Sequence, residues 1–233
     1  MTPVDLLAGS ALGSLLGMRH ALEPDHLAAV STLITAERDG RARRAAWLGA
    51  CWGVGHSLTL VAAGAVLIGL RRAMPPSVAD AFEGCVAVML IGLGLRAIYQ
   101  AVVQGPVGPP HVHRHGRLAH IHAGAAPHVH VGRWTLARRP LLVGAVHGLA
   151  GSGALTAAVL AELPSNTARL AYMALFGLGS TVGMAALSGL LGWPVGRLAR
   201  RRGVARATAL AVGCLSLLLG VWWGYPLVGR LLG

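Results

Sequence analysis

The chain has 233 residues, of which 55% are hydrophobic and only 12% are charged. A soluble domain carries about 25% charged residues, so this composition excludes an ordinary soluble protein and indicates an integral membrane protein. The net charge of +12 comes from arginine alone, because the sequence contains no lysine. These arginines lie mostly between apolar segments, which favours a role in orienting the chain in a lipid bilayer over nucleic-acid binding.

Six apolar segments are each long enough to cross about 30 Å of hydrocarbon as a helix. The first segment is longer than one crossing needs, which is consistent with a tilt or with a break at Pro24. The six segments cover residues 4–36, 44–70, 80–104, 139–162, 166–192 and 205–231.

Arginine is concentrated in the loops that follow the first, third and fifth segments. Because cytoplasmic loops of membrane proteins carry an excess of basic residues, we expect these three loops in the cytoplasm. Both termini would then face outside. The predicted location is the inner membrane of a prokaryotic cell.

The two halves of the sequence resemble each other. Residues 17–22 parallel 144–149 at a shift of 127, and residues 53–57 parallel 177–181 at a shift of 124. A three-helix unit that is repeated once must invert its topology, as in many transporters.

The predicted fold is therefore an all-α integral membrane protein. It has six transmembrane helices, arranged as two inverted three-helix repeats, and the first helix is broken near Pro24. Residues 1–104 would form the first repeat with a metal motif, 105–137 a cytoplasmic loop, and 138–233 the second repeat.

A polar motif interrupts the first apolar segment, with two imidazoles and two carboxylates among seven residues. Ionisable side chains within a membrane span are costly and usually mark a site or a pathway. Imidazole and carboxylate together are ligands for divalent transition metals. A proline removes one helical hydrogen bond, so a break here would let the side chains converge and leave a free carbonyl at His20. The motif consists of His20, Glu23, Pro24, Asp25 and His26.

Two further histidines lie within apolar segments. His56 follows two closely spaced glycines in the second segment, and His147 occupies the position in the fourth segment that matches His20. Each could be a buried histidine that only packs, but beside the first motif we favour metal ligation for both. Ser152 stands where the first motif has Asp25, and function or tight packing remain equally open for it.

A hydrophilic segment separates the two halves and carries seven histidines. Histidine-rich tracts with Gly and Pro are typical of flexible metal-binding segments, so we expect loose, exchangeable metal contacts here. These accessory histidines are His111, His113, His115, His120, His122, His128 and His130.

The motif resembles the nickel/cobalt transporter family (NiCoT) and the wider NicO group, which includes urease-associated membrane proteins. The signature of that family is a His, four residues and then Asp-His, which matches His20, Asp25 and His26 here. Its Leu-Gly-His-Ser element looks like Val54-Gly55-His56-Ser57. The family commonly has Asp-Ala at positions 23 and 24, and its best-known members have eight spans where this chain shows six.

We therefore predict a secondary-type permease that takes up Ni²⁺, with Co²⁺ as a second candidate ion. His20, Asp25 and His26 would be the core ligands, while Glu23 and His56 would assist or relay protons. The metal is the transported substrate and not a cofactor, and the chain is not an enzyme. A cytoplasmic metallochaperone is a candidate partner, and the oligomeric state is open.

Two alternatives remain on the sequence alone. The first is an exporter of Ni²⁺ or Co²⁺, since the same wider group includes exporters with His-rich loops. The second and less favoured is an intramembrane metal-dependent hydrolase, which lacks support because the sequence has no His-Glu-x-x-His motif.

Overall fold

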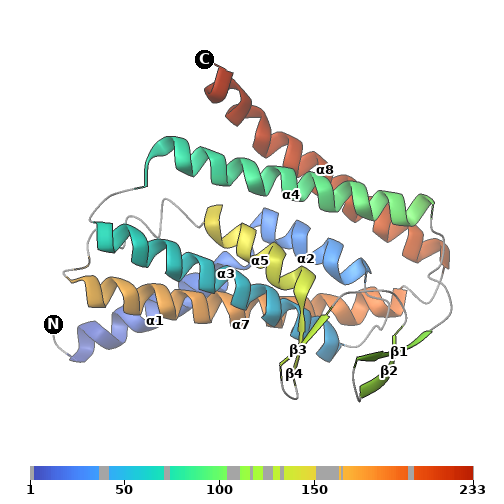
Figure 1. Ribbon diagram of the computed structural model, residues 1–233, viewed down its shortest axis with the longest axis horizontal. Helices are drawn as coiled ribbons and strands as arrows, with labels where there is room; N and C mark the ends of the chain where they lie inside the picture. Colours follow the sequence, from blue (N-terminus) through green and yellow to red (C-terminus); the bar gives the residue numbers. More distant parts are fainter. Residues whose placement is uncertain are drawn as a thin grey trace.

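A computed structural model describes residues 3–36, 42–70, 74–103, 111–115, 118–122, 128–131, 134–150, 163, 165–198 and 202–232 (Figure 1). Within these ranges the chain is a helical bundle with two small β-hairpins. The helices are α1 (Pro3–His20), α2 (Pro24–Ala36), α3 (Ala42–Leu70), α4 (Pro76–Val102), α5 (Arg138–Ala150), α7 (Asn166–Leu198) and α8 (Arg202–Leu232).

The helices run back and forth along one direction. Figure 1 shows α1 and α2 following each other along the bundle, after which α3 returns and α4 runs forward again. The hairpins lie at the end of the bundle where α4 stops and α5 begins, while the N-terminus lies at the opposite end. The first apolar segment therefore crosses the bundle once, as two consecutive helices.

The predicted break near Pro24 is confirmed. Helix α1 ends at His20 and α2 begins at Pro24, with a tight turn between them. The expectation of a free carbonyl at His20 is wrong, because the turn supplies another donor: the Glu23 N–H donates to it at 3.0 Å. The turn ends where the Glu23 carbonyl accepts the N–H of Leu27 at 2.9 Å and starts α2.

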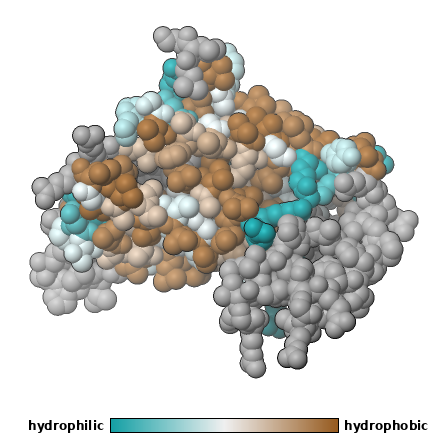
Figure 2. Space-filling view, in the orientation of Figure 1, coloured by the Kyte–Doolittle hydropathy of each residue, from teal (hydrophilic) through white to brown (hydrophobic). Residues whose placement is uncertain are grey.

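Among the described residues, four helices are individually long and apolar enough to cross a membrane, by length and composition. They are Ala42–Leu70, Pro76–Val102, Asn166–Val195 and Gly203–Arg230, and they match four of the six predicted segments. The first predicted segment is divided between α1 and α2. The fourth is described only as far as α5, and Ser152 lies outside the described residues. Figure 2 shows apolar side chains covering much of the visible side of the bundle, as contact with lipid requires.

Glycines bring α3 and α7 into close contact at two matching places. A Cβ atom at Gly53 would lie 2.6 Å from the Cα of Thr181, and one at Gly177 would lie 2.8 Å from the Cβ of Ser57. Ser57 Oγ donates to the Gly177 carbonyl at 2.7 Å and lies 3.0 Å from Thr181 Oγ1. Such small-residue contacts replace the hydrophobic driving force that helices lack in lipid.

Helices α4 and α8 show the same kind of contact. A Cβ at Gly94 would meet Gly213 and Leu217, and a Cβ at Gly220 would meet Ala87 and Ile91. The buried Ser216 hydroxyl donates to the carbonyl of Leu90 at 2.9 Å and adds a polar link between the two helices. Two separate helix pairs are thus joined at their glycines.

The histidine-rich segment differs from the expectation of a flexible loop. Strand β1 (His111–His115) pairs antiparallel with β2 (Leu118–His122), and β3 (His128–Val131) pairs with β4 (Trp134–Ala137). The reason is visible in the sequence, because His alternates with Val, Ile or Arg in a period of two that favours strands. The register places His111 opposite His122 and His113 opposite His120.

Candidate metal site in the membrane

Five of the predicted site residues come together where α1 and α2 meet. His20 is the last residue of α1, and Asp25 and His26 open α2. His56 reaches the same place from the middle of α3, and His147 reaches it from α5. All five are buried, with at most 6% of each residue exposed. The break at Pro24 thus gathers residues from four helices at one point inside the bundle.

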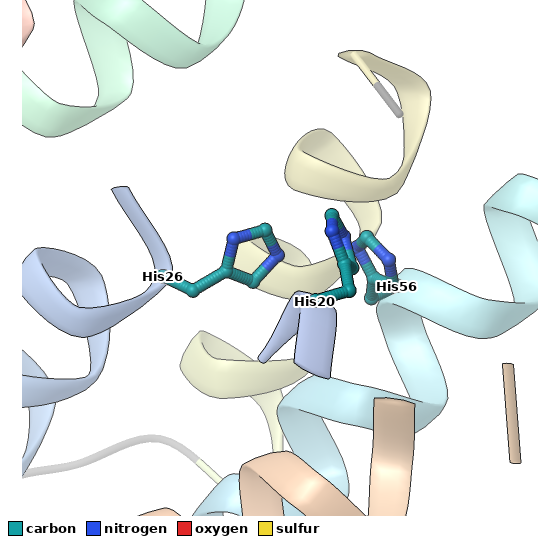
Figure 3. A group of neighbouring side chains, drawn as sticks. All are labelled: His20, His26 and His56. Atoms are coloured by element: carbon teal, nitrogen blue, oxygen red, sulfur yellow. The ribbon is translucent and has the colours of Figure 1, made fainter. Parts of the chain in front are cut away.

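Three imidazoles form the first group. The ring centroid of His20 lies 4.3 Å from that of His26 and 5.1 Å from that of His56. The centroids of His26 and His56 are 5.4 Å apart. Figure 3 shows the His26 ring extending toward the neighbouring rings of His20 and His56. One nitrogen from each ring can be chosen so that all three lie within 4.8 Å of one another. This spacing allows three imidazoles to coordinate one ion.

Asp25 holds the second group together. Its Oδ1 lies 3.0 Å from Nδ1 of His26 and accepts the His26 backbone N–H at 2.9 Å. Its Oδ2 lies 2.7 Å from Nε2 of His147. Asp25, His26 and His147 again offer ligand atoms within 4.8 Å of one another. One buried carboxylate therefore bridges two imidazoles, one from each half of the sequence.

Several ring nitrogens at this point have no hydrogen-bond partner among the described residues. They are Nδ1 and Nε2 of His20, Nε2 of His26, Nδ1 and Nε2 of His56, and Nδ1 of His147. Buried polar atoms in native proteins are nearly always paired, so a cluster of unpaired nitrogens calls for an explanation. A divalent metal ion would engage one nitrogen of each ring, because neutral imidazole nitrogens are good ligands for Ni²⁺ and its neighbours.

Glu23 stands at the edge of the site. Its Oε1 lies 2.9 Å from Nδ1 of His20, but the two atoms are not aligned for a hydrogen bond. Its side chain is 48% exposed, whereas that of His20 is 3% exposed. The carboxylate therefore sits between the buried histidines and the surface of the protein.

Two aromatic residues that we did not predict line the site. Trp52 is fully buried, and its ring lies 5.4 Å from that of His26 and 5.8 Å from that of His147. Phe176 on α7 is also buried and lies 5.3 Å from His20. The position of Trp52 could have been predicted, since it precedes His56 by one helical turn and so shares its face of α3.

Glycines allow the helices that carry these histidines to approach one another closely. A Cβ at Gly17 would collide with the carbonyl oxygen of Phe176, and a Cβ at Gly144 would collide with that of Trp52. A Cβ at Gly148 would collide with the carbonyl oxygen of His56. Each glycine lies within one turn of a site histidine, so the close packing fixes the imidazoles as well as the helices.

The structure thus brings together His20, Asp25, His26, His56 and His147, with Glu23 at their edge. It does not describe Ser152, nor the side chains of the seven histidines between residues 111 and 130. No sequence pattern had indicated that Asp25 would touch two histidines from different halves.

Comparisons with known proteins found a family and a relative. Residues 7–195 match the family described as high-affinity nickel-transport protein, NicO. The chain is also similar to the urease accessory protein UreH of Bacillus sp. (strain TB-90), with 31% identity over 227 residues. That alignment covers 97% of this chain and 95% of the relative. No solved structure matches the chain significantly.

The family match spans the whole site and most of the bundle, from α1 into α7. A family of transport proteins also agrees with the prediction that the chain is not an enzyme, and it makes Ni²⁺ a substrate and not a cofactor. Long apolar helices and this match together identify a multi-pass membrane protein. The chain belongs to the NicO family of high-affinity nickel-transport proteins.

Proposed function

We propose that this protein is a Ni²⁺ permease whose ion passes through the buried histidine cluster. The observation that carries the proposal is the group of His20, His26 and His56, with ligand nitrogens within 4.8 Å of one another. Ni²⁺ binds well to imidazole, and Co²⁺ is a neighbour with similar preferences, so both ions fit this group. The break between α1 and α2 is supporting evidence, since broken helices line substrate sites in many transporters.

At the position formed by His20, His26 and His56, Asp25 acts behind the imidazoles and not as the direct ligand that the sequence indicated. Its two oxygens are engaged with His26 and His147, so it orients these rings as carboxylates do behind metal-bound histidines. It also contributes a negative charge close to the ion. The contact with Asp25 fixes the orientation of the His26 ring, so that the ring points at the ion position.

The proposal includes the inverted-repeat architecture. Its support is that contacts occur in matched pairs when α3 is equated with α7 and α4 with α8. Gly53 meets Thr181 as Gly177 meets Ser57, and Gly94 meets Leu217 as Gly220 meets Ile91. Such reciprocity is what a two-fold axis between two similar halves produces. A site at the junction of inverted repeats is suited to alternating access.

We propose uptake as the direction of transport. A high-affinity family description favours import, because an importer has to capture a dilute ion. The test is nickel accumulation in cells that express the protein from an inducible promoter, with an uninduced culture as the control. Induction should raise cell-associated ⁶³Ni²⁺ at low external nickel. A fall in accumulation together with better growth in high nickel would identify an exporter instead.

The proposed orientation gives a labelling prediction. With both termini outside, a cysteine at Thr2 or Ser165 should react with a membrane-impermeant maleimide added to intact cells. A cysteine at Arg43 or His115 should react only after the membrane is permeabilised. Each variant is made in a background where Cys51, Cys85 and Cys214 are replaced by serine or alanine. Labelling of Arg43 and His115 positions in intact cells would reverse the orientation.

The hairpins give a second prediction. Deleting residues 111–130 should leave a folded protein that still transports Ni²⁺, because none of the five buried site residues lies in that segment. The apparent affinity should change, because paired strands hold several histidines in register near one end of the bundle. Uptake is compared with wild type at matched membrane expression. Complete loss of uptake by the deletion protein would show that the hairpins are part of the transport path.

A further inference from the structure

The two groups of possible ligands overlap in a single residue. One group is His20, His26 and His56, the other is Asp25, His26 and His147, and neither contains both His20 and His147. The ring centroids of His26 and His147 are 4.1 Å apart, close to the 4.3 Å between His26 and His20. His26 therefore stands between two alternative coordination sets.

His20 and His147 occupy matching places in the two halves of the chain. Each follows a glycine by three residues. A Cβ at either glycine would collide with a backbone carbonyl of the facing helix. Gly17 faces Phe176, whose ring lies beside His20 at 5.3 Å, and Gly144 faces Trp52, whose ring lies beside His147 at 5.8 Å. The two coordination sets thus use one equivalent histidine from each half.

We infer that the site has two overlapping ion positions and that His26 passes the ion from one to the other. The first position is formed by His20, His26 and His56, and the second by Asp25, His26 and His147. This inference rests on the proposed permease function and adds the path of the ion within it. Movement between positions built from opposite halves is what alternating access across inverted repeats would require.

The chemistry of His26 limits the site to one ion at a time. A neutral imidazole carries one proton and has one nitrogen with a free lone pair, so it can bind an ion on only one side. When the ion changes sides, the nitrogen that it approaches releases its proton to water and the nitrogen that it leaves takes up a proton from water, so the ring stays neutral and the number of bound protons is unchanged. On moving, the ion leaves His20 and His56, keeps His26, and gains His147 and the Asp25 carboxylate. The second position therefore carries one more negative charge than the first.

The test combines metal binding and transport on the full-length chain. The seven hairpin histidines are first replaced by glutamine, and we call this full-length protein the hairpin-Gln background. Purified protein is titrated with Ni²⁺ alone by equilibrium dialysis, and ⁶³Ni²⁺ uptake is measured in cells at matched expression. His20→Gln, His147→Gln and the double variant are compared with their parent.

The parent should bind one Ni²⁺ per chain. Each single variant should still bind one Ni²⁺, because one of the two positions survives, but its uptake should fall by about tenfold or more. The double variant should lose both binding and uptake. A matched control is Ser216→Ala, which removes a buried hydroxyl that bonds to α4. Ser216 lies on α8, a helix that carries none of the site residues, so this variant should behave like the parent.

Two results would overturn the relay. Uptake at the parental rate in His147→Gln would show that the second position is not used. Loss of binding in both single variants would indicate one site that needs all its ligands. In either case the parent still binds and transports Ni²⁺, so the permease proposal survives. Failure of the wild-type chain to bind and transport Ni²⁺ would instead overturn the proposed function. If a glutamine variant misfolds on gel filtration, asparagine replaces it at the same position.

Discussion

Asp25→Asn is expected to leave the protein folded and to lower Ni²⁺ uptake by about 10- to 100-fold, as loss of a carboxylate behind metal-binding histidines does elsewhere. The amide has nearly the same shape, and its oxygen can still accept the His26 backbone N–H that Asp25 accepts at 2.9 Å. Its NH₂ group cannot accept a hydrogen bond from a second imidazole, and the negative charge beside the ion is lost. The measurement is radiolabelled Ni²⁺ uptake at matched membrane expression.

Asp80→Asn is the matched control, because it is the same chemical change at another carboxylate of the bundle. Asp80 pairs with Arg230 at 2.8 Å between α4 and α8, outside the histidine cluster. Its replacement should leave uptake near the wild-type rate, since a partly exposed ion pair contributes little to stability. Wild-type uptake by Asp25→Asn would mean that Asp25 is a structural acid.

His26→Gln should have the largest effect of any single change, because His26 belongs to both possible coordination sets. It should remove high-affinity Ni²⁺ binding by the purified hairpin-Gln background and reduce uptake to that of cells without the protein. Glutamine is similar in length but offers an amide oxygen, a much weaker ligand for Ni²⁺ than imidazole. Binding is measured by equilibrium dialysis, and folding by gel filtration.

Thr32→Val on the same helix controls for the loss of a buried polar side chain. Thr32 is 4% exposed, and its hydroxyl donates to the nearby Ala29 carbonyl at 2.7 Å. Valine has the same shape without the hydroxyl, so binding and uptake should both persist. Undiminished Ni²⁺ binding by a folded His26→Gln protein would mean that the ion is held elsewhere.

Much of the fold could be predicted from the sequence because its signals are local. Apolar length locates the spanning helices, and Pro24 indicates where the first one breaks, since a proline lacks the N–H that the helical hydrogen-bond pattern uses. The hairpins could not be predicted from composition, because a run of His, Gly and Pro is typical of a flexible segment. Their alternating pattern was the better signal, and backbone pairing followed it.

The site was predictable in its membership but not in its geometry. His20, His26, His56 and His147 stood out because ionisable groups in apolar spans are costly. The bridge from Asp25 to His147 depends on how α5 packs against α3, where Gly144 and Gly148 allow close approach. No local pattern reports such tertiary contacts, and Phe176 was missed for the same reason.

The central claim is that Ni²⁺ binds to buried imidazoles at the break between α1 and α2. X-ray absorption at the nickel edge tests it most directly, using the full-length hairpin-Gln background loaded with one equivalent of Ni²⁺. Because this protein retains only the four histidines of the site, any imidazole signal must come from them. The account predicts a nickel spectrum with imidazole ligands that disappears in His26→Gln. A spectrum without imidazole, or one that His26→Gln leaves unchanged, would contradict it.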